Sequence, residues 1–458
     1  MRTRRCCRQA CSVQFASHPS RSSNSVAKQA NPADQAIALA KRRLVPFLLL
    51  MYVVSFLDRA NIGFAKEALH ASAGISDASF ALGAGLFFLT YALFEIPSNL
   101  IMHRVGARVW MCRIMVSWGL ISMATMFVTG QTSFYVLRLL LGAAEAGFFP
   151  GIILYVSYWF PNRTKGQILG LFYFGAPLAF IFGGPLSGLL LELPSATGLF
   201  GWQWMFLVEG FLAVLVGVWA YRYLGNRPAE VLWLTDEQKM ALQSELSGEE
   251  QQRRSHGAAA FPAALADTRL LYFMLLYFLI QMSVYGVVFY LPTEVGAILG
   301  KKVGIEVGFV SAIPWLCAMA ATYWIPRAAD RHKNHRLLAI LTLFISGLAS
   351  LAFPASTPTL AMVALCLAAS GFIAVQPLFW TFPMTYLADS AAAGGLASIN
   401  ALGAVGGFVA PNAKVWADRH FGSPHAGAYL LAAFTLLTAA LLVGVRQQKP
   451  PAQRQSQG

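Results

Sequence analysis

Apolar stretches long enough to cross a lipid bilayer recur along most of this chain. A helix needs roughly 20 such residues to cross the hydrocarbon core, because each residue advances it by about 1.5 Å. Of the 458 residues, 57% are hydrophobic and 12% are charged, whereas soluble domains carry about a quarter charged residues. We therefore predict an all-α integral membrane protein with about twelve transmembrane helices.

A polar stretch separates the expected spans into two blocks of six. The spans are Leu44–Phe64, Phe80–Ile101, Val109–Val128, Ser133–Tyr155, Gln167–Leu190, Met205–Leu224, Leu270–Pro292, Val307–Pro326, Leu337–Phe353, Thr359–Tyr386, Gly394–Val415 and Gly427–Val445. We divide the chain into a basic, disordered tail (1–43), a first bundle (44–224), a cytoplasmic linker (225–268), a second bundle (269–446) and a short tail (447–458). In the linker, Thr235 followed by Glu237 and Gln238 predicts the start of a short amphipathic helix.

Positive charge is distributed unevenly between the two ends of the spans. Of the 34 Lys and Arg residues, 27 lie in tails and loops on the side of the amino terminus and five on the opposite side. The positive-inside rule places the more basic side in the cytoplasm. We therefore expect both termini in the cytoplasm and the protein in a plasma membrane, the inner membrane of a bacterium. The net charge of +14 follows from this topology, so we expect the lipid bilayer, and no nucleic acid, as a partner.

The two blocks of six spans share sequence features. The fifth span, GLFYFGAPLAFIFGGPLSG, and the eleventh, GGLASINALGAVGGFVAPN, both carry Gly and Pro at helical intervals. Small residues at such intervals allow helices to approach closely. The loop after the second span, HRVGAR, has a counterpart after the eighth, ADRHKNHR. Two related six-helix bundles are what alternating access around one central site requires.

Two arginines, Arg59 and Arg138, lie inside stretches that otherwise read as transmembrane helix. A guanidinium in the bilayer interior is costly unless it faces a partner or a water-filled cavity, so such residues mark candidate substrate pathways. Each has a carboxylate on its own helix, Asp58 beside Arg59 and Glu145 two turns beyond Arg138. We expect these four side chains to form the centre of a functional site.

The spacing of these charges constrains how they can pair. Neighbouring residues of a helix point about 100° apart, so Asp58 and Arg59 cannot satisfy each other well, whereas Asn61 lies near the face of Asp58. Arg138 and Glu145 share a stripe but lie about 10 Å apart along the axis, which leaves room for a ligand or another helix. The alternative is a structural charge pair between the first and fourth spans.

The chain resembles the major facilitator superfamily and, within it, the anion:cation symporter family. The resemblance covers about residues 41–445 and rests on FLDRANIGFA, IPSNLIMHRVGAR, RLLLGAAEAGFFPGIILYVSYWFP, WQWMFLVEG and ASINALGAVGGFVAP. It implies the major facilitator fold, two pseudo-symmetric bundles of six helices. The family's loop signature usually contains an aspartate where this chain has His103, a residue that can change its charge near neutral pH.

The resemblance also implies roles for particular residues. Asp58 and Glu145 match the family's proton-coupling positions, and Arg59 and Arg138 match its substrate-binding positions. Further cavity residues that it implies are Tyr91, Tyr285, Trp380 and Asn400, to which we add Gln281 as a candidate. The expected gating loops contain His103, Arg104, Gly106, Arg108, Asp330 and Arg331. For the aromatic residues, ordinary helix packing is the competing interpretation, and we expect Glu95 and Glu209 to make structural or gate contacts.

These observations predict a proton-coupled transporter of a small organic anion. A substrate carboxylate docked on a guanidinium removes positive field from nearby carboxylates and so favours their protonation. By linkage, protonation then favours anion binding equally. The implied substrates are tartrate-like dicarboxylates, sugar acids and aromatic acids, with a tartrate-type permease as the narrowest expectation. We expect no metal or other cofactor besides the coupling proton, no enzymatic activity, and a monomer. The alternatives are a facilitator, an exchanger or a membrane sensor.

Overall fold

The structure, a computed structural model, describes residues 31–194, 198–255, 267–352, 357–386 and 390–445. Residues 1–30 of the first expected tail and all of the second (447–458) lie outside this range. The elements are α1 (Pro32–Ala73), α2 (Asp77–Val105), α3 (Ala107–Ala124), η1 (Thr125–Phe127), α4 (Gln131–Glu145), α5 (Phe148–Trp159), α6 (Asn162–Phe172), α7 (Gly175–Leu191), α8 (Gly201–Tyr223), η3 (Pro228–Glu230), α9 (Asp236–Ser255), α11 (Thr268–Val288), α12 (Leu291–Leu299), α13 (Ile305–His332), α14 (His335–Ala352), α15 (Pro358–Tyr386), α16 (Ser390–His420) and α17 (Ala426–Leu442).

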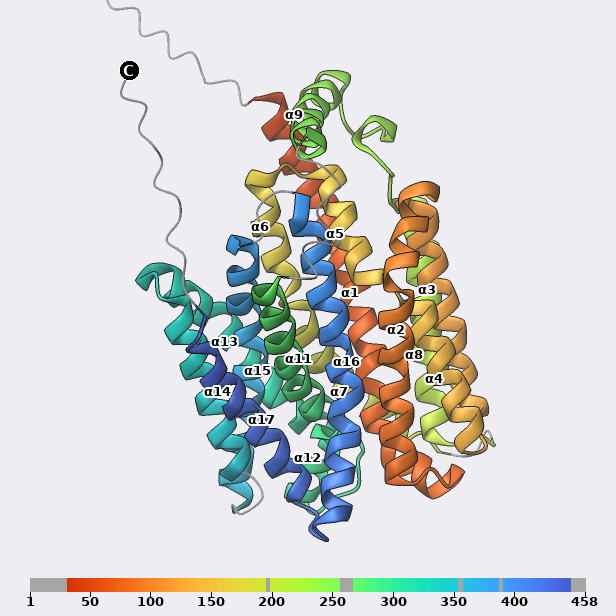
Figure 1. The fold of residues 1–458 in the computed structure, drawn as a ribbon. Helices are drawn as coiled ribbons and strands as arrows, with labels where there is room; N and C mark the ends of the chain where they lie inside the picture. The colour runs from red at the N-terminus through yellow and green to blue at the C-terminus, as the bar shows by residue number, and fades with distance from the viewer. Residues whose placement is uncertain (1–30, 195–197, 256–266, 353–356, 387–389, 446–458) are drawn as a thin grey trace, which may run out of the picture.

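The predicted all-helical membrane fold is confirmed. In the described part of the chain, ten helical segments are long and apolar enough to cross a membrane. The two remaining predicted spans lie in α1, which has 42 residues, and in α17, an apolar helix of 17 residues. The spans form two groups, which we call the N half (α1–α8) and the C half (α11–α17), and they lie side by side in Figure 1. Helix α9 covers one end of the molecule, here called the linker end, and α12 lies toward the opposite or far end.

The first helix begins earlier than the sequence analysis predicted. Residues 32–43, which we assigned to the disordered tail, form the first turns of α1. Asn31 caps this helix, because its side-chain oxygen accepts a hydrogen bond from Ala33 N at 3.1 Å, and Pro32 occupies the first helical turn, where its missing N–H costs nothing. The basic character of this stretch therefore belongs to a capped helix.

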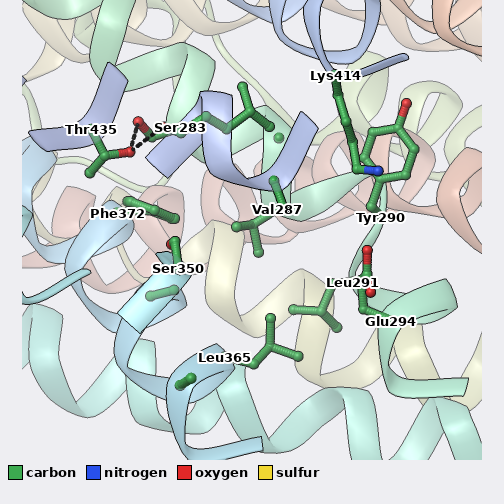
Figure 2. A pocket seen from close by; sticks show the side chains of 15 residues that line it. Ser283, Val287, Tyr290, Leu291, Glu294, Ser350, Leu365, Phe372, Lys414 and Thr435 are labelled. Carbon is green, nitrogen blue, oxygen red and sulfur yellow. Dashed lines mark hydrogen bonds between the residues drawn. The ribbon is translucent and has the colours of Figure 1, made fainter. Parts of the chain in front are cut away.

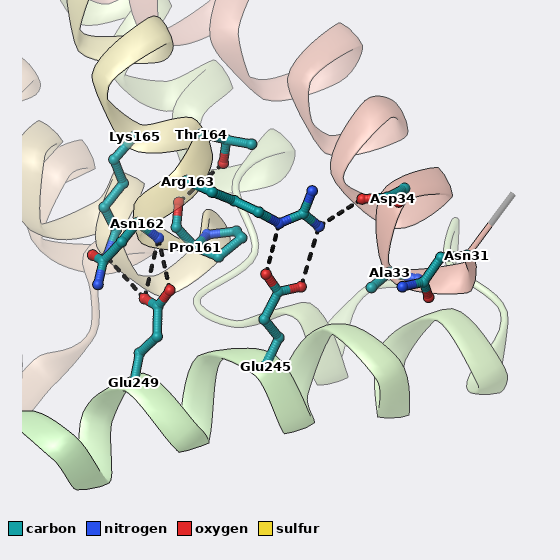
Figure 3. Close-up of polar contacts among 10 residues, drawn as sticks. All are labelled: Asn31, Ala33, Asp34, Pro161, Asn162, Arg163, Thr164, Lys165, Glu245 and Glu249. Carbon is teal, nitrogen blue, oxygen red and sulfur yellow. Dashed lines mark hydrogen bonds and ion pairs between the residues drawn. The ribbon is translucent and has the colours of Figure 1, made fainter. Parts of the chain in front are cut away.

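Polar contacts attach the linker helix α9 to the N half (Figure 3). Arg163, at the start of α6, donates through Nε to Glu245 of α9 at 2.8 Å and through Nη2 to Asp34 of α1 at 2.5 Å. The backbone N–H of Asn162 donates to Glu249 at 2.8 Å. The helix starts just after Thr235, as predicted. These contacts hold α9 against the N half.

Three of the predicted single spans are interrupted. The fourth is split into α4 and α5, the fifth lies across α6 and α7, and the seventh is split into α11 and α12. Discontinuous helices at membrane depth are tolerated where they line a cavity or are buried in protein. The fourth-span break is described with the site below.

Backbone-to-backbone contacts join the two halves at the far end. Gly184 of α7 faces Gly308 of α13, and a methyl group added to Gly184 would lie 2.6 Å from the Gly308 carbonyl oxygen. One turn further on, a methyl group on Gly188 would lie 2.5 Å from the Gly304 carbonyl oxygen. Glu192, just after α7, accepts a hydrogen bond from Ile305 N at 2.8 Å and so caps α13 across the interface. Glycine is therefore required on both helices for this closure.

We predict that Gly184→Ala prevents the far end from closing while leaving each half folded. Because the added methyl group overlaps the backbone of α13, α7 and α13 must separate. Spin labels at Leu193 and Lys302, in a background without the six cysteines, will report longer distances in the variant. Gly170→Ala is the matched control, because nothing lies within 4 Å of an added methyl group there. Identical distance distributions for both variants would contradict the assignment.

Candidate functional site

A cavity lies between the two halves near the middle of the molecule. The volume of this cavity is about 60 Å³. Nine of the fourteen described residues that line it are aromatic, and they come from both halves. The lining comprises Tyr52, Phe56, Arg59, Phe88, Tyr91, Phe149, Tyr173, Tyr277, Gln281, Tyr285, Gln376, Trp380, Asn400 and Ala404. A space of this kind at the interface of two bundles is where a transporter binds its substrate.

Arg59 projects into this cavity from α1 and is held by contacts on several sides. Its Nε and Nη2 atoms donate to a single oxygen of Glu145, at 2.9 and 2.6 Å, and its Nη1 donates to the hydroxyl of Tyr285 at 3.3 Å. The rings of Phe87 and Tyr91 lie 5.5 and 5.0 Å from the guanidinium carbon. Aromatic faces attract a cation, so these rings help to compensate the charge. The side chain spans both halves, since Tyr285 belongs to α11.

Glu145 reaches Arg59 because the fourth span breaks immediately after it. Helix α4 ends at Glu145, and α5 starts at Phe148. Gly147 lies between them with φ of +83°, a conformation that favours glycine, and a methyl group on it would lie 2.4 Å from Ser98 Oγ. Glu145 is fully buried; its Oε1 also accepts from Ser55 Oγ at 3.2 Å.

Asp58 points into the N half rather than into the cavity. Its Oδ1 accepts hydrogen bonds from the Ser122 hydroxyl and from Asn61 Nδ2, the latter at 3.3 Å. Its Oδ2 has no hydrogen-bond partner among the described residues. The prediction that Asp58 and Arg59 diverge, with Asn61 on the face of Asp58, is therefore confirmed.

Arg138, which we expected to bind substrate, is not among the described residues that line the cavity, and a substrate-binding role for it stays a prediction. The residue is 3% exposed and lies inside the N half, with Phe134 and Phe206 near its guanidinium. Its Nε and Nη2 find no hydrogen-bond partner within the described ranges, although Asp58 and Glu145 are close enough to interact with its charge. The packing of helices around α4 places Arg138 behind the wall of the cavity, that is, behind the residues that line it. The described groups that interact with its charge are therefore the carboxylates of Asp58 and Glu145.

The other cavity residues that the sequence analysis proposed do lie together. Tyr91, Gln281, Tyr285, Trp380 and Asn400 all line the cavity. The sequence analysis missed further lining residues, which it had no means to separate from packing aromatics: Tyr52, Phe56, Phe88, Phe149, Tyr173, Tyr277, Gln376 and Ala404. Gln376 opens the run QPLFWTFPMTY in the tenth span, and a polar residue in an apolar span is the signal that could have found it.

The predicted gating residues lie at the linker end, in two separate turns. Gly106 joins α2 to α3 with φ of +98°, and Arg108 N donates to Asn226 Oδ1 at 3.0 Å. In the second turn, Asp330 Oδ1 lies 2.8 Å from Nε2 of His335. A gating role for the set stays a prediction: His103, Arg104, Gly106, Arg108, Asp330 and Arg331.

Two further carboxylates are buried in the N half. Asn400 of α16 donates through Nδ2 to Oε1 of Glu95 at 2.8 Å, a contact between the halves next to the cavity. Glu209 accepts from Ser187 Oγ at 2.8 Å, inside the N half. Each residue is 2% exposed, and each has a second oxygen without a hydrogen-bond partner in the part of the chain that the structure describes.

A second cavity lies within the C half and differs in character (Figure 2). Its lining is mainly apolar, and the Ser283 and Thr435 hydroxyls satisfy each other at 2.7 Å. Lys414 lies at one edge, where its ammonium is 4.6 Å from the centre of the Tyr290 ring and 3.1 Å from Asp418. Glu294 also lines this cavity, whereas no carboxylate is among the described residues that line the central one, so this cavity is a poorer anion site.

Two bundles of membrane helices around a shared polar cavity define a membrane transporter. The chain belongs to the Major Facilitator Superfamily, whose family model matches residues 48–411. It is 43% identical to the inner membrane transport protein RhmT of Escherichia coli K12 over 92% of this chain and 97% of that protein. It is 41% identical to a putative tartrate transporter of Agrobacterium vitis over 90% and 91%. The xylose transporter XylE from E. coli, in a partially occluded inward-open conformation, superposes with a TM-score of 0.69 over 89% of this chain and 98% of that one, at 13% identity, and supports the fold alone.

We predict that Gly147→Ala destabilises the protein by roughly 1–3 kcal/mol, because it forces a side chain into a left-handed conformation and against Ser98. The unfolding temperature of the purified protein will fall by several degrees. Gly166→Ala, in the neighbouring helix α6, meets nothing within 4 Å and is the control. If both variants unfold at the wild-type temperature, the break is not fixed by Gly147.

Proposed function

We propose that the protein is a secondary active transporter that couples protons to the movement of a small organic anion. The observation that carries this proposal is the shared use of one guanidinium. Arg59 faces the cavity, yet Glu145 occupies its Nε and Nη2 atoms. Those two donors form a fork of the kind that a substrate carboxylate prefers. Substrate and Glu145 therefore compete for the same cation.

Proton binding to Glu145 resolves this competition. A neutral carboxyl group holds the guanidinium far less strongly than a carboxylate does. The freed fork of Arg59 can then accept the substrate anion, and the bound anion in turn favours the protonated form of Glu145. By linkage, each ligand raises the affinity for the other by the same factor. This reciprocity is the thermodynamic basis of symport.

The balance of buried charge supports the same conclusion. Among the described residues of the N half, four carboxylates are buried at Asp58, Glu95, Glu145 and Glu209, against the guanidiniums of Arg59 and Arg138. With every group ionised, the region would carry two excess negative charges at membrane depth, where uncompensated charge is costly. An added anion would increase this excess. In this proposal, protons taken up by these carboxylates offset the charge of the anion.

In this proposal, Asp58 is the second group that binds a proton, and the charge of Arg138 controls how readily it does so. Arg138 lies near the carboxylates of both Asp58 and Glu145 without a hydrogen bond from Nε or Nη2 to any described residue. Its charge can therefore favour the ionised form of either acid. When one of these two carboxylates loses its proton, it attracts Arg138 more strongly. Arg138 then stabilises the ionised form of the other carboxylate less. Asp58 would thus complete the coupling site without touching the substrate.

The membrane potential sets the direction in which this cycle runs. We take the linker end as cytoplasmic, because the basic tails and loops lie on that side. A monoanion entering a cell that is negative inside is opposed by about 2.3 kcal/mol per 100 mV. One proton cancels the charge, and two make uptake electrogenic. We therefore propose proton-driven import across a bacterial inner membrane, with sugar acids, aromatic acids and tartrate-like acids as the substrate classes.

We predict that Glu145→Gln and Asp58→Asn abolish the response of uptake to an inward proton gradient in proteoliposomes. A coupling free energy of about 1–3 kcal/mol corresponds to a roughly 5–150-fold effect, and this stimulation is what the variants should lose. Exchange of substrate between equal pH values should survive, because it needs no net proton movement. Glu67→Gln, at an exposed residue of α1, is the matched control. Gradient-driven uptake by Glu145→Gln at the wild-type rate would refute the coupling scheme, and a wild type that ignores the gradient would indicate a facilitator or exchanger.

We predict that Arg59→Lys weakens substrate binding by tenfold or more. A lysine ammonium keeps the charge but lacks the planar fork, and a hydrogen bond to a charged group is worth about 1.5–3 kcal/mol. Isothermal titration with the transported anion measures the loss. Arg113→Lys, at an exposed position of α3, is the control and should bind normally. Equal affinity in both variants would exclude Arg59 as the anchor.

A further inference from the structure

We propose that the cavity selects a singly charged carboxylate, and that Glu95, held behind the wall by Asn400, excludes a second carboxylate. The substrate is then a monocarboxylate with a flat or ring-shaped face and a hydroxyl or N–H donor. This inference rests on the proposed organic-anion function and narrows it. It disfavours tartrate, which carries two negative charges at neutral pH, despite the expectation from the sequence.

The first argument is the supply of cations. Arg59 is the one cationic side chain among the described residues that line the cavity. Arg138 lies behind the wall and cannot bind a second carboxylate in this arrangement. A dicarboxylate anchored on Arg59 would therefore bring a second charge into a chamber without a matching cation. Such a charge is strongly penalised at low dielectric.

The second argument is the position of Glu95. It lies on α2 one turn beyond Tyr91, whose ring is 5.0 Å from the Arg59 guanidinium carbon. Its Oε1 accepts from Asn400, a lining residue, at 2.8 Å, and its Oε2 has no partner among the described side chains. One turn of helix is about 5.4 Å. A negative group reaching from Arg59 past Tyr91 would approach Glu95, which repels it when ionised and supplies no compensating positive charge when protonated.

The third argument is the kind of polar group that the cavity leaves unsatisfied. Gln281 lines the cavity, and its buried Oε1 finds no donor in the described part of the chain. A carbonyl oxygen requires a hydroxyl or an N–H group, and a carboxylate offers neither. The remaining lining is mostly aromatic, which suits the face of a sugar or an aromatic ring. The Arg59 guanidinium, the Gln281 acceptor and the aromatic lining together fit a monocarboxylate that is hydroxylated or aromatic.

Two pairs of hydroxylated acids that differ by one carboxylate test this inference: gluconate with glucarate, and 4-hydroxybenzoate with 4-hydroxyphthalate. Purified protein is titrated with each acid at one pH, and the rise in unfolding temperature gives relative affinity. We expect gluconate or 4-hydroxybenzoate to bind at least tenfold more tightly than its dicarboxylate partner. In Glu95→Gln, which keeps an oxygen for the Asn400 amide, dicarboxylate affinity should rise at least tenfold. Monocarboxylate affinity should change less than threefold, and the exposed variant Glu67→Gln should retain wild-type selectivity.

The ratio of the two affinities distinguishes an electrostatic role of Glu95 from a structural one. A structural role would lower the affinity for both members of a pair together and leave the ratio unchanged, which would overturn the inference. Equal binding of both members by the wild type, with proton-driven uptake intact, would overturn the inference alone. If none of the four acids binds and no uptake responds to the proton gradient, the organic-anion function fails and this inference fails with it.

Discussion

The contact between Arg59 and Glu145 is the interaction on which the rest of the site depends. A guanidinium inside a membrane requires compensation, and here one carboxylate oxygen takes two of its donors at 2.9 and 2.6 Å. The same guanidinium faces the cavity and reaches Tyr285 of the other half. Arg59 therefore interacts at once with Glu145, with the cavity and with the other half of the molecule. A change at any one of these alters the other two.

The fold produces this arrangement through local irregularities in otherwise regular helices. Glu145 ends α4 because Gly147 adopts a positive φ that other residues resist, so the acid is available for Arg59 instead of continuing along a helix face. At the far end, Gly184 and Gly308 bring the two backbones together. Glycine thus serves two purposes here, since it allows one helix to break and two others to approach.

Charge in the N half is arranged in layers around the cavity. Arg59 is in direct reach of a ligand, whereas Asp58 and Arg138 lie behind the wall and Glu95 is linked to the cavity through Asn400. Groups behind the wall act through the field they impose, which is strong at low dielectric. Such an arrangement separates the cation that faces the cavity from the charged groups that lie behind its lining.

The sequence by itself determined the membrane class, the two blocks of six spans and the presence of a charge, Arg59, within an apolar span, because these are local properties. It also anticipated that Asp58 and Arg59 diverge, since that follows from helix geometry. Only the tertiary structure decided that Arg138 faces the interior, that Glu95 meets Asn400 305 residues further along the chain, and that residues 32–43 are helical. The physical reason is that spacing fixes the direction of a side chain around its own helix, whereas its partner depends on how other helices pack against that face.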